Sequence, residues 1–174
     1  MNKSQIRIIA LVLVFFFSPH LFAEESGPDV ERNWTIQVDP LTTFIGFAHL
    51  QIERKLTSDF SLYAGPHARL FSAPGGEKED FLGFGLEMGL RWFPWGSSPA
   101  GAWALVRGVG AYVFSDSDEE WGGYISGLVG YTFILSDFFV LSGGAGIQYL
   151  HYRVGNLGPK GIFPALHTTF GFAF

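Results

Sequence analysis

The sequence predicts an all-β fold, a single antiparallel up-and-down transmembrane β-barrel of about eight strands that follows a cleaved signal peptide. Three observations lead to this prediction. The chain begins with a basic and then apolar leader, it is rich in aromatic residues but poor in charge, and its apolar residues fall in short alternating runs.

Residues 1–23 have the order of a secretory signal peptide. Lys3 and Arg7 precede the apolar run at residues 8–17, and the small residue Ala23 ends the segment. The run is too short to predict a membrane-spanning helix. We therefore expect cleavage after Ala23, a periplasmic segment over residues 24–33 and a barrel domain over residues 34–174.

The composition excludes several classes of protein. The chain has 11 basic and 16 acidic side chains, and such an acidic protein is not expected to bind nucleic acid. It contains no cysteine, which rules out disulfides, a lipid anchor on Cys and thiolate metal sites. Aromatic residues make up 17% and charged residues only 16%, too apolar a balance for a water-facing surface. No clean helical span follows the leader, because Ser136, Asp137 and several glycines interrupt the best stretch, so the apolar residues are expected to cross as strands.

Turn signals divide the rest of the chain into strand-like runs. A first pair is expected over residues 35–44 and 47–56, with Pro40 at an edge or a bulge. The count of eight strands depends on this pair. The six remaining strands are expected at residues 60–71, 81–93, 102–114, 123–135, 138–153 and 162–174.

The alternation is clearest in residues 81–93, where large apolar side chains share one face and Gly, Glu87 and Arg91 share the other. A strand with period two and one wholly apolar face is typical of contact with lipid. Connections after residues 56 and 135 are short, whereas those after 71, 114 and 153 are longer and polar, as periplasmic turns and extracellular loops would be. Four tryptophans are expected at the membrane interface of the short-turn end: Trp34, Trp92, Trp95 and Trp103.

The last eight residues alternate apolar side chains and end in Phe, which resembles the C-terminal signal of bacterial outer-membrane proteins. Residues 38–41 and 52–62 also look like the opening of small barrels related to the OmpA and OmpX-like families. The resemblance implies a Gram-negative outer-membrane protein in contact with lipid and lipopolysaccharide. It also implies that Phe170, Phe172 and Phe174 form an assembly signal read by the barrel-assembly machinery. We expect a monomer.

The polar face supplies a lumen network of Glu53, Arg69, Glu87, Arg91 and Arg107. An eight-stranded barrel is just wide enough for side chains to fill, and buried charges must pair. We therefore expect an internal salt-bridge network with no transport, and a narrow pore lined by the same residues is the alternative.

Residues 148–153 with Asn156, Gly158 and Pro159 resemble the active-site strand of PagL-type lipid A deacylases, with His151 at the position of their histidine. Arg153 stands where the nucleophilic Ser is expected, and no Asp or Glu follows Asp137, so we expect no catalysis. The other alternative is a soluble lipocalin-like barrel, whose apolar face would point inward around a ligand.

Four histidines, His49, His67, His151 and His167, lie on different segments, and no pair has the close spacing of a zinc site. We expect hydrogen-bonded lumen histidines, with no metal and no other cofactor. Acidic runs at 77–80 and 116–120 would form an extracellular rim. The sequence thus predicts an outer-membrane barrel with a structural role, or a surface-binding role through its loops.

Overall fold

The computed structural model describes residues 32–44, 46–72, 80–114, 119–152 and 159–174. They belong to one compact unit, Glu31–Phe174. The expected signal peptide and nearly all of the expected periplasmic segment lie outside the described residues, as do parts of the acidic rim.

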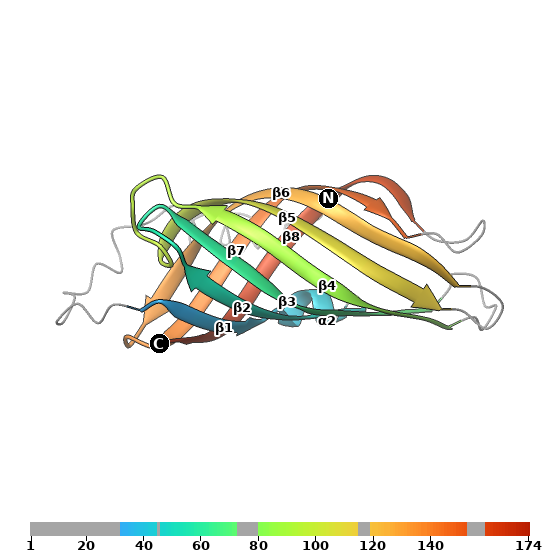
Figure 1. Ribbon diagram of the computed structural model, residues 1–174, viewed down its shortest axis with the longest axis horizontal. Helices are drawn as coiled ribbons and strands as arrows, with labels where there is room; N and C mark the ends of the chain where they lie inside the picture. The colour runs from blue at the N-terminus through green and yellow to red at the C-terminus, as the bar shows by residue number, and fades with distance from the viewer. Residues whose placement is uncertain (1–31, 45, 73–79, 115–118, 153–158) are drawn as a thin grey trace, which may run out of the picture. The chain divides into compact units, whose positions relative to one another are not determined.

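Eight antiparallel strands close into a barrel in chain order, which confirms the predicted fold class (Figure 1). Each strand pairs with the next along the chain, and the last pairs with the first. The strands are β1 (Trp34–Val38), β2 (Phe47–Lys55), β3 (Phe60–Ser72), β4 (Asp80–Trp92), β5 (Gly101–Phe114), β6 (Glu119–Leu135), β7 (Phe139–His151) and β8 (Lys160–Ala173). Within the described ranges, no helix has the length and apolar character needed to cross a membrane.

The first predicted strand is wrong in its second half. β1 ends at Val38, and a short helix, α2 (Pro40–Phe44), follows it. Asp39 caps this helix, because its Oδ1 accepts a hydrogen bond of 3.0 Å from the backbone N of Thr42. Pro40 occupies the first helical position, where its fixed φ is favourable and its missing N–H costs nothing. Pro40 therefore begins a helix instead of marking a bulge.

β6 begins at Glu119, four residues earlier than predicted, and the connection between β5 and β6 shrinks to residues 115–118. Trp121 pairs with Tyr112 across the two strands, and their rings lie 5.1 Å apart. The acidic and glycine residues of this segment are typical of a loop. The cross-strand aromatic contact explains why the strand nevertheless extends through it.

The apolar face of the barrel points outward and the polar face points inward. Along β4, Leu86 is 67% exposed while its neighbour Glu87 is 1% exposed. The same alternation continues around the barrel, where the outward side chains include Ile36, Ile52, Leu62, Phe84, Val106, Ile125, Val129, Ile147 and Leu166. Alternation in the sequence shows that each strand has one apolar face, but it does not show whether that face points outward or inward.

The short turns after β2 and β6 lie at the same end of the barrel as the longer connection after β4, and the backbones of Trp34 and Phe174 also bond to each other there, at 2.9 and 3.0 Å. Trp34, Trp92 and Trp95 are exposed there. Trp103 is 2% exposed and points inward, so its predicted interfacial position is wrong. Its ring lies against two glycines, Gly130 and Gly144, where an added Cβ would come within 2.3 and 2.4 Å of the indole.

Candidate functional site

All five residues of the predicted lumen network lie in the barrel interior. Glu53, Arg69, Glu87, Arg91 and Arg107 are each at most 4% exposed and come from four neighbouring strands, β2 to β5. Asp39, which the sequence analysis did not place in the network, is also buried. The buried charged residues described by the structure are thus three acids and three arginines, whose formal charges balance.

Arg91 and Glu53 form the ion pair nearer the short-turn end. Arg91 Nη1 lies 2.7 Å from Glu53 Oε2, and both side chains are almost fully buried. The other groups that hold this pair are Thr35, Gln37 and Ser61, which donate to Glu53, and His167, whose Nε2 lies 2.7 Å from Arg91 Nη2. The guanidinium also lies over the Trp103 ring at 4.9 Å, so aromatic surface takes the place of water around the cation.

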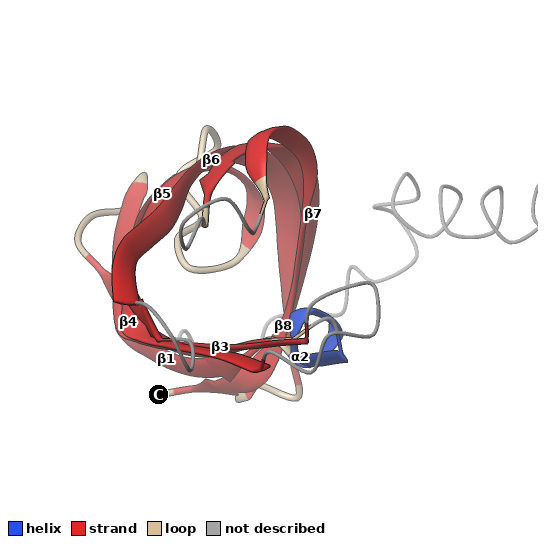
Figure 2. Ribbon diagram, turned by 90° about the vertical axis from the view of Figure 1, so that its right-hand side faces the viewer, coloured by secondary structure: helices blue, strands red, loops and turns tan. Residues whose placement is uncertain are grey.

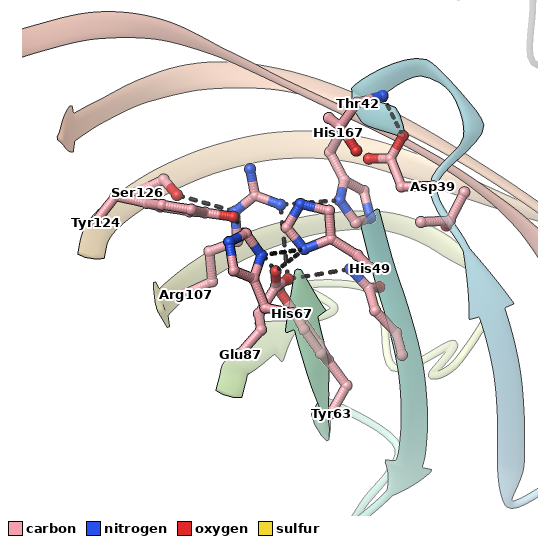
Figure 3. Close-up of polar contacts among 12 residues, drawn as sticks. Asp39, Thr42, His49, Tyr63, His67, Glu87, Arg107, Tyr124, Ser126 and His167 are labelled. Carbon is pink, nitrogen blue, oxygen red and sulfur yellow. Dashed lines mark hydrogen bonds and ion pairs between the residues drawn. The ribbon is translucent and has the colours of Figure 1, made fainter. Parts of the chain in front are cut away.

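Glu87, near the middle of β4, is the centre of a second cluster (Figure 3). Its Oε1 accepts hydrogen bonds from the Tyr63 hydroxyl at 2.8 Å and from Gln51 Nε2 at 3.1 Å. Its Oε2 lies 2.5 Å from His49 Nδ1 and 3.3 Å from the Tyr124 hydroxyl. Arg107 Nη1 is 3.7 Å from Oε1, which makes it the arginine nearest to this carboxylate among the ion pairs of the described residues.

His49 and His67 lie side by side in the same cluster, with ring centroids 4.5 Å apart and ring planes tilted by 53°. They are directly paired across β2 and β3, and their Nδ1 atoms are 3.1 Å apart. The hydroxyl of Tyr152 lies 3.2 Å from Nε2 of His67. Because the histidines occupy different segments of the sequence, no contact between them was predicted. A signal was nevertheless present, since His49 and His67 lie equally far from Ser58, the middle of the intervening turn.

The three residues His49, His67 and Glu87 could hold a metal ion. Each offers one ligand atom, all are buried, and these atoms lie within 4.8 Å of one another. Imidazole nitrogen and carboxylate oxygen are ligands that zinc and its neighbours in the first transition row accept.

The two remaining arginines also contact neutral groups. Arg69 lies over the rings of Phe47 and Tyr152 at 4.4 and 4.1 Å. Arg107 donates through Nε to Ser126 Oγ at 2.9 Å, and its Nη1 lies 3.5 Å from Nδ1 of His167. These contacts fix both cations against the wall of the barrel.

A cavity of about 360 Å³ adjoins the Glu87 cluster, in the part of the wall that β1 is too short to fill. β1 pairs only with residues 50–54 of β2 and 170–173 of β8, and α2 contacts both strands beyond that point. Figure 2 shows α2 beside β8. Interior and outer residues both line the cavity: Leu41, Thr42, Phe47, His49, Arg107, Tyr124, Gln148, Pro164 and Leu166.

Asp39 fastens α2 to the barrel. Besides capping the helix, its carboxylate accepts bonds from the backbone N and the hydroxyl of Thr168 on β8, at 3.4 and 3.0 Å. The buried carboxylate of Asp39 thus caps α2 directly after the end of β1 and holds the helix against β8.

The remaining predicted residues lie away from these clusters. His151 is exposed on the outer face at the end of β7, whereas Arg153, Asn156 and Gly158 lie outside the described residues. Phe170, Phe172 and Phe174 point outward and are 39%, 53% and 60% exposed. Their side chains are therefore accessible on the barrel surface near the chain end.

No protein-family model, no curated protein and no solved structure matches this chain. Its function is therefore inferred from the geometry of the barrel.

Proposed function

We propose that this protein is an integral β-barrel of the Gram-negative outer membrane, with a filled lumen and a structural or surface-binding role. The observation that carries the proposal is the continuous apolar outer face of a closed barrel. Outward residues such as Leu86, Val129 and Ile147 are each about two-thirds exposed. A soluble protein rarely exposes contiguous apolar patches larger than a few hundred Å², whereas a lipid-embedded barrel requires such a surface.

The arrangement disfavours the lipocalin-like alternative. In a lipocalin-like barrel the apolar side chains would line a ligand cavity and the polar side chains would face water. Here the buried inner positions hold Glu53, Glu87 and Arg91, while the outer positions of the same strands are apolar. The polarity is the reverse of that of a water-soluble barrel, which supports a surrounding lipid phase.

The interior supports a closed lumen over a narrow pore. Arg91 on β4 pairs with Glu53 on β2 and also reaches His167 on the opposite strand β8, and the rings of Tyr63 and Trp103 lie against the same guanidinium. Opening a path through this layer would separate a buried ion pair, which typically costs about 3 to 5 kcal/mol. We therefore propose that the protein does not conduct ions and does not catalyse a reaction, and that binding runs through its longer loops.

The proposal is tested by the gel mobility of the protein extracted from outer-membrane fractions, boiled and unboiled. A closed barrel resists detergent until heated, because it has no free strand edge at which to unzip. A heat-dependent shift in that fraction is the expected result. Recovery of the protein in the soluble periplasmic or secreted fraction would contradict the proposal and favour the lipocalin-like barrel.

Two further measurements separate the remaining alternatives. In planar bilayers we expect no discrete conductance steps, and reproducible steps would show that the lumen conducts. In cells that overexpress the protein we expect lipid A of unchanged mass, and loss of an acyl chain would establish a deacylase.

A further inference from the structure

We propose that His49, His67 and Glu87 form a buried binding site for one divalent transition-metal ion, such as Zn²⁺, inside the barrel. All three residues are buried, and their ligand atoms lie within 4.8 Å of one another. This inference goes beyond the proposed function, because it concerns the barrel interior and holds whether lipid or water surrounds the barrel.

The proton balance of the three groups favours a cation between them. His49 Nδ1 lies 2.5 Å from Glu87 Oε2 and 3.1 Å from His67 Nδ1. A ring nitrogen has one in-plane position, which holds either a hydrogen or a lone pair. If His49 donates to Glu87, it cannot also accept from His67. If it accepts from His67, its lone pair faces the carboxylate. A metal ion can accept one lone pair from each of the three ligands, His49, His67 and Glu87, at the same time.

The distances suit coordination after a small adjustment. Two imidazole nitrogens bound to tetrahedral zinc at about 2.0 to 2.1 Å lie roughly 3.3 Å apart, close to the 3.1 Å between the two Nδ1 atoms. The contact between His49 and Glu87 has to lengthen to a similar value, and the ligand atoms of His67 and Glu87, which lie within 4.8 Å of each other, have to take that separation as well.

Surrounding groups hold the ligands in the orientation that coordination needs. Tyr63 and Gln51 bind Oε1 of Glu87, which leaves Oε2 directed at His49. The Tyr152 hydroxyl lies beside Nε2 of His67 and can accept its hydrogen, so that Nδ1 presents a lone pair to the metal. Outer contacts of this kind fix the tautomer and orientation of metal-binding histidines.

The site has room for a further ligand. The adjoining cavity is lined by His49 and Tyr124, both of which contact Glu87. The same cavity is lined by Thr42, whose buried hydroxyl has no hydrogen-bond partner among the described residues. Three protein ligands and one open position, filled by water or a small anion, are typical of zinc sites that can exchange ligands.

Nearby arginines lower the affinity of the site for a metal ion but do not abolish binding. Arg107 is 3.7 Å from Glu87 Oε1 and competes for its charge, and Arg69 lies on the Tyr152 ring that adjoins His67. The buried acids and arginines already balance, so the ion adds positive charge to the interior. We therefore expect stoichiometric binding of one ion, with an affinity that Arg107 and Arg69 reduce.

The test uses the mature chain extracted from membranes as its heat-modifiable form, stripped with a chelator and then equilibrated with Zn²⁺ or Co²⁺. We expect one bound ion per chain by elemental analysis, together with the visible ligand-field absorption of Co²⁺. His49→Gln, His67→Gln and Glu87→Gln should each lose the bound ion while keeping the heat-dependent gel shift.

Two control variants are matched to these three. His167→Gln removes another fully buried lumen histidine, and His151→Gln removes an exposed one, and both should bind as the wild type does. A stripped wild-type chain that takes up no ion would overturn the inference whatever the variants do, and so would binding that survives loss of both His49 and His67. A soluble barrel that still binds one ion would overturn the membrane location alone, whereas an outer-membrane barrel without the ion would overturn the site alone.

Discussion

The interior of the barrel depends on single residues, because an added side chain that is tolerated on the outer face is not tolerated on the inner face. Gly89 and Gly108 are both strand glycines, but only Gly89 faces inward. An added Cβ on Gly89 would lie 2.3 Å from the ring of Tyr63, while no atom of the described residues lies within 4 Å of one on Gly108. Because Gly89 has no side chain, the Tyr63 ring has room to lie against it and to place its hydroxyl on Glu87.

Gly89→Ala should destabilise the folded barrel, because it displaces the Tyr63 ring and removes the 2.8 Å hydrogen bond from Tyr63 to Glu87. Overpacking of this kind costs about 1 to 3 kcal/mol. The check is the urea midpoint of the barrel reconstituted in vesicles, followed by tryptophan fluorescence. Gly108→Ala is the control and should leave that midpoint unchanged. An unchanged midpoint for Gly89→Ala would show that the ring does not occupy this place.

The ion pair of Arg91 and Glu53 supplies a second prediction at this scale. Arg91→Met leaves the Glu53 carboxylate buried without its cation, and we expect a loss of about 3 to 5 kcal/mol in unfolding free energy. Adding Glu53→Gln to this variant should recover part of the loss, because the unpaired charge is then gone. The same urea titration measures both. Arg54→Met, on the outer face beside Trp34, is the control and should cost no more than about 1 kcal/mol.

Sequence periodicity sufficed to identify Glu53, Arg69, Glu87, Arg91 and Arg107 as one polar face, because the side-chain period of a strand is a local property. It did not predict their partners. Which histidine meets Glu87 depends on the register of β2, β3 and β4, and Trp103 points inward because Gly130 and Gly144 on two other strands leave space for it.

At the scale of the elements, the join between β1 and α2 departs most from the prediction. Residues 40–44 carry a strand-like composition, yet the cap at Asp39 and the proline after it set a helix. The Asp-Pro pair is a local signal that outweighs the apolar pattern, and the bonds from Asp39 to Thr168, 129 residues away, could not be read from the chain.

Asp39→Ala should loosen α2 while leaving the other strands closed. The variant loses the helix cap, which is worth about 0.5 to 2 kcal/mol, together with the two bonds to Thr168. We expect faster amide hydrogen exchange at Thr42 and Thr168, with exchange in β4 and β5 unchanged. Asp59→Ala in the exposed turn between β2 and β3 is the control. Equal exchange rates in the Asp39 variant and the wild type would contradict the assigned role of Asp39.

At the scale of the whole molecule, strand number and order followed from the sequence, since turns and short alternating runs are local signals and up-and-down connection is the simplest way to join them. The direction of the apolar face did not follow, because alternation is the same for a barrel that faces lipid and one that faces water. The exposed outer residues of the closed barrel supply that missing direction.

The central claim, that lipid surrounds this outer face, is tested most directly by a nitroxide label at Leu86→Cys in outer-membrane vesicles. The chain has no cysteine, so a single introduced thiol is labelled without background. Leu86 is 67% exposed on the outside of β4, and Ser58→Cys, in an exposed turn, is the control. We predict that dissolved oxygen relaxes the label at residue 86 more strongly than a water-soluble nickel complex does, with the reverse at residue 58. Strong relaxation of the residue 86 label by the nickel complex would mean that water covers the apolar face, and would contradict the membrane barrel.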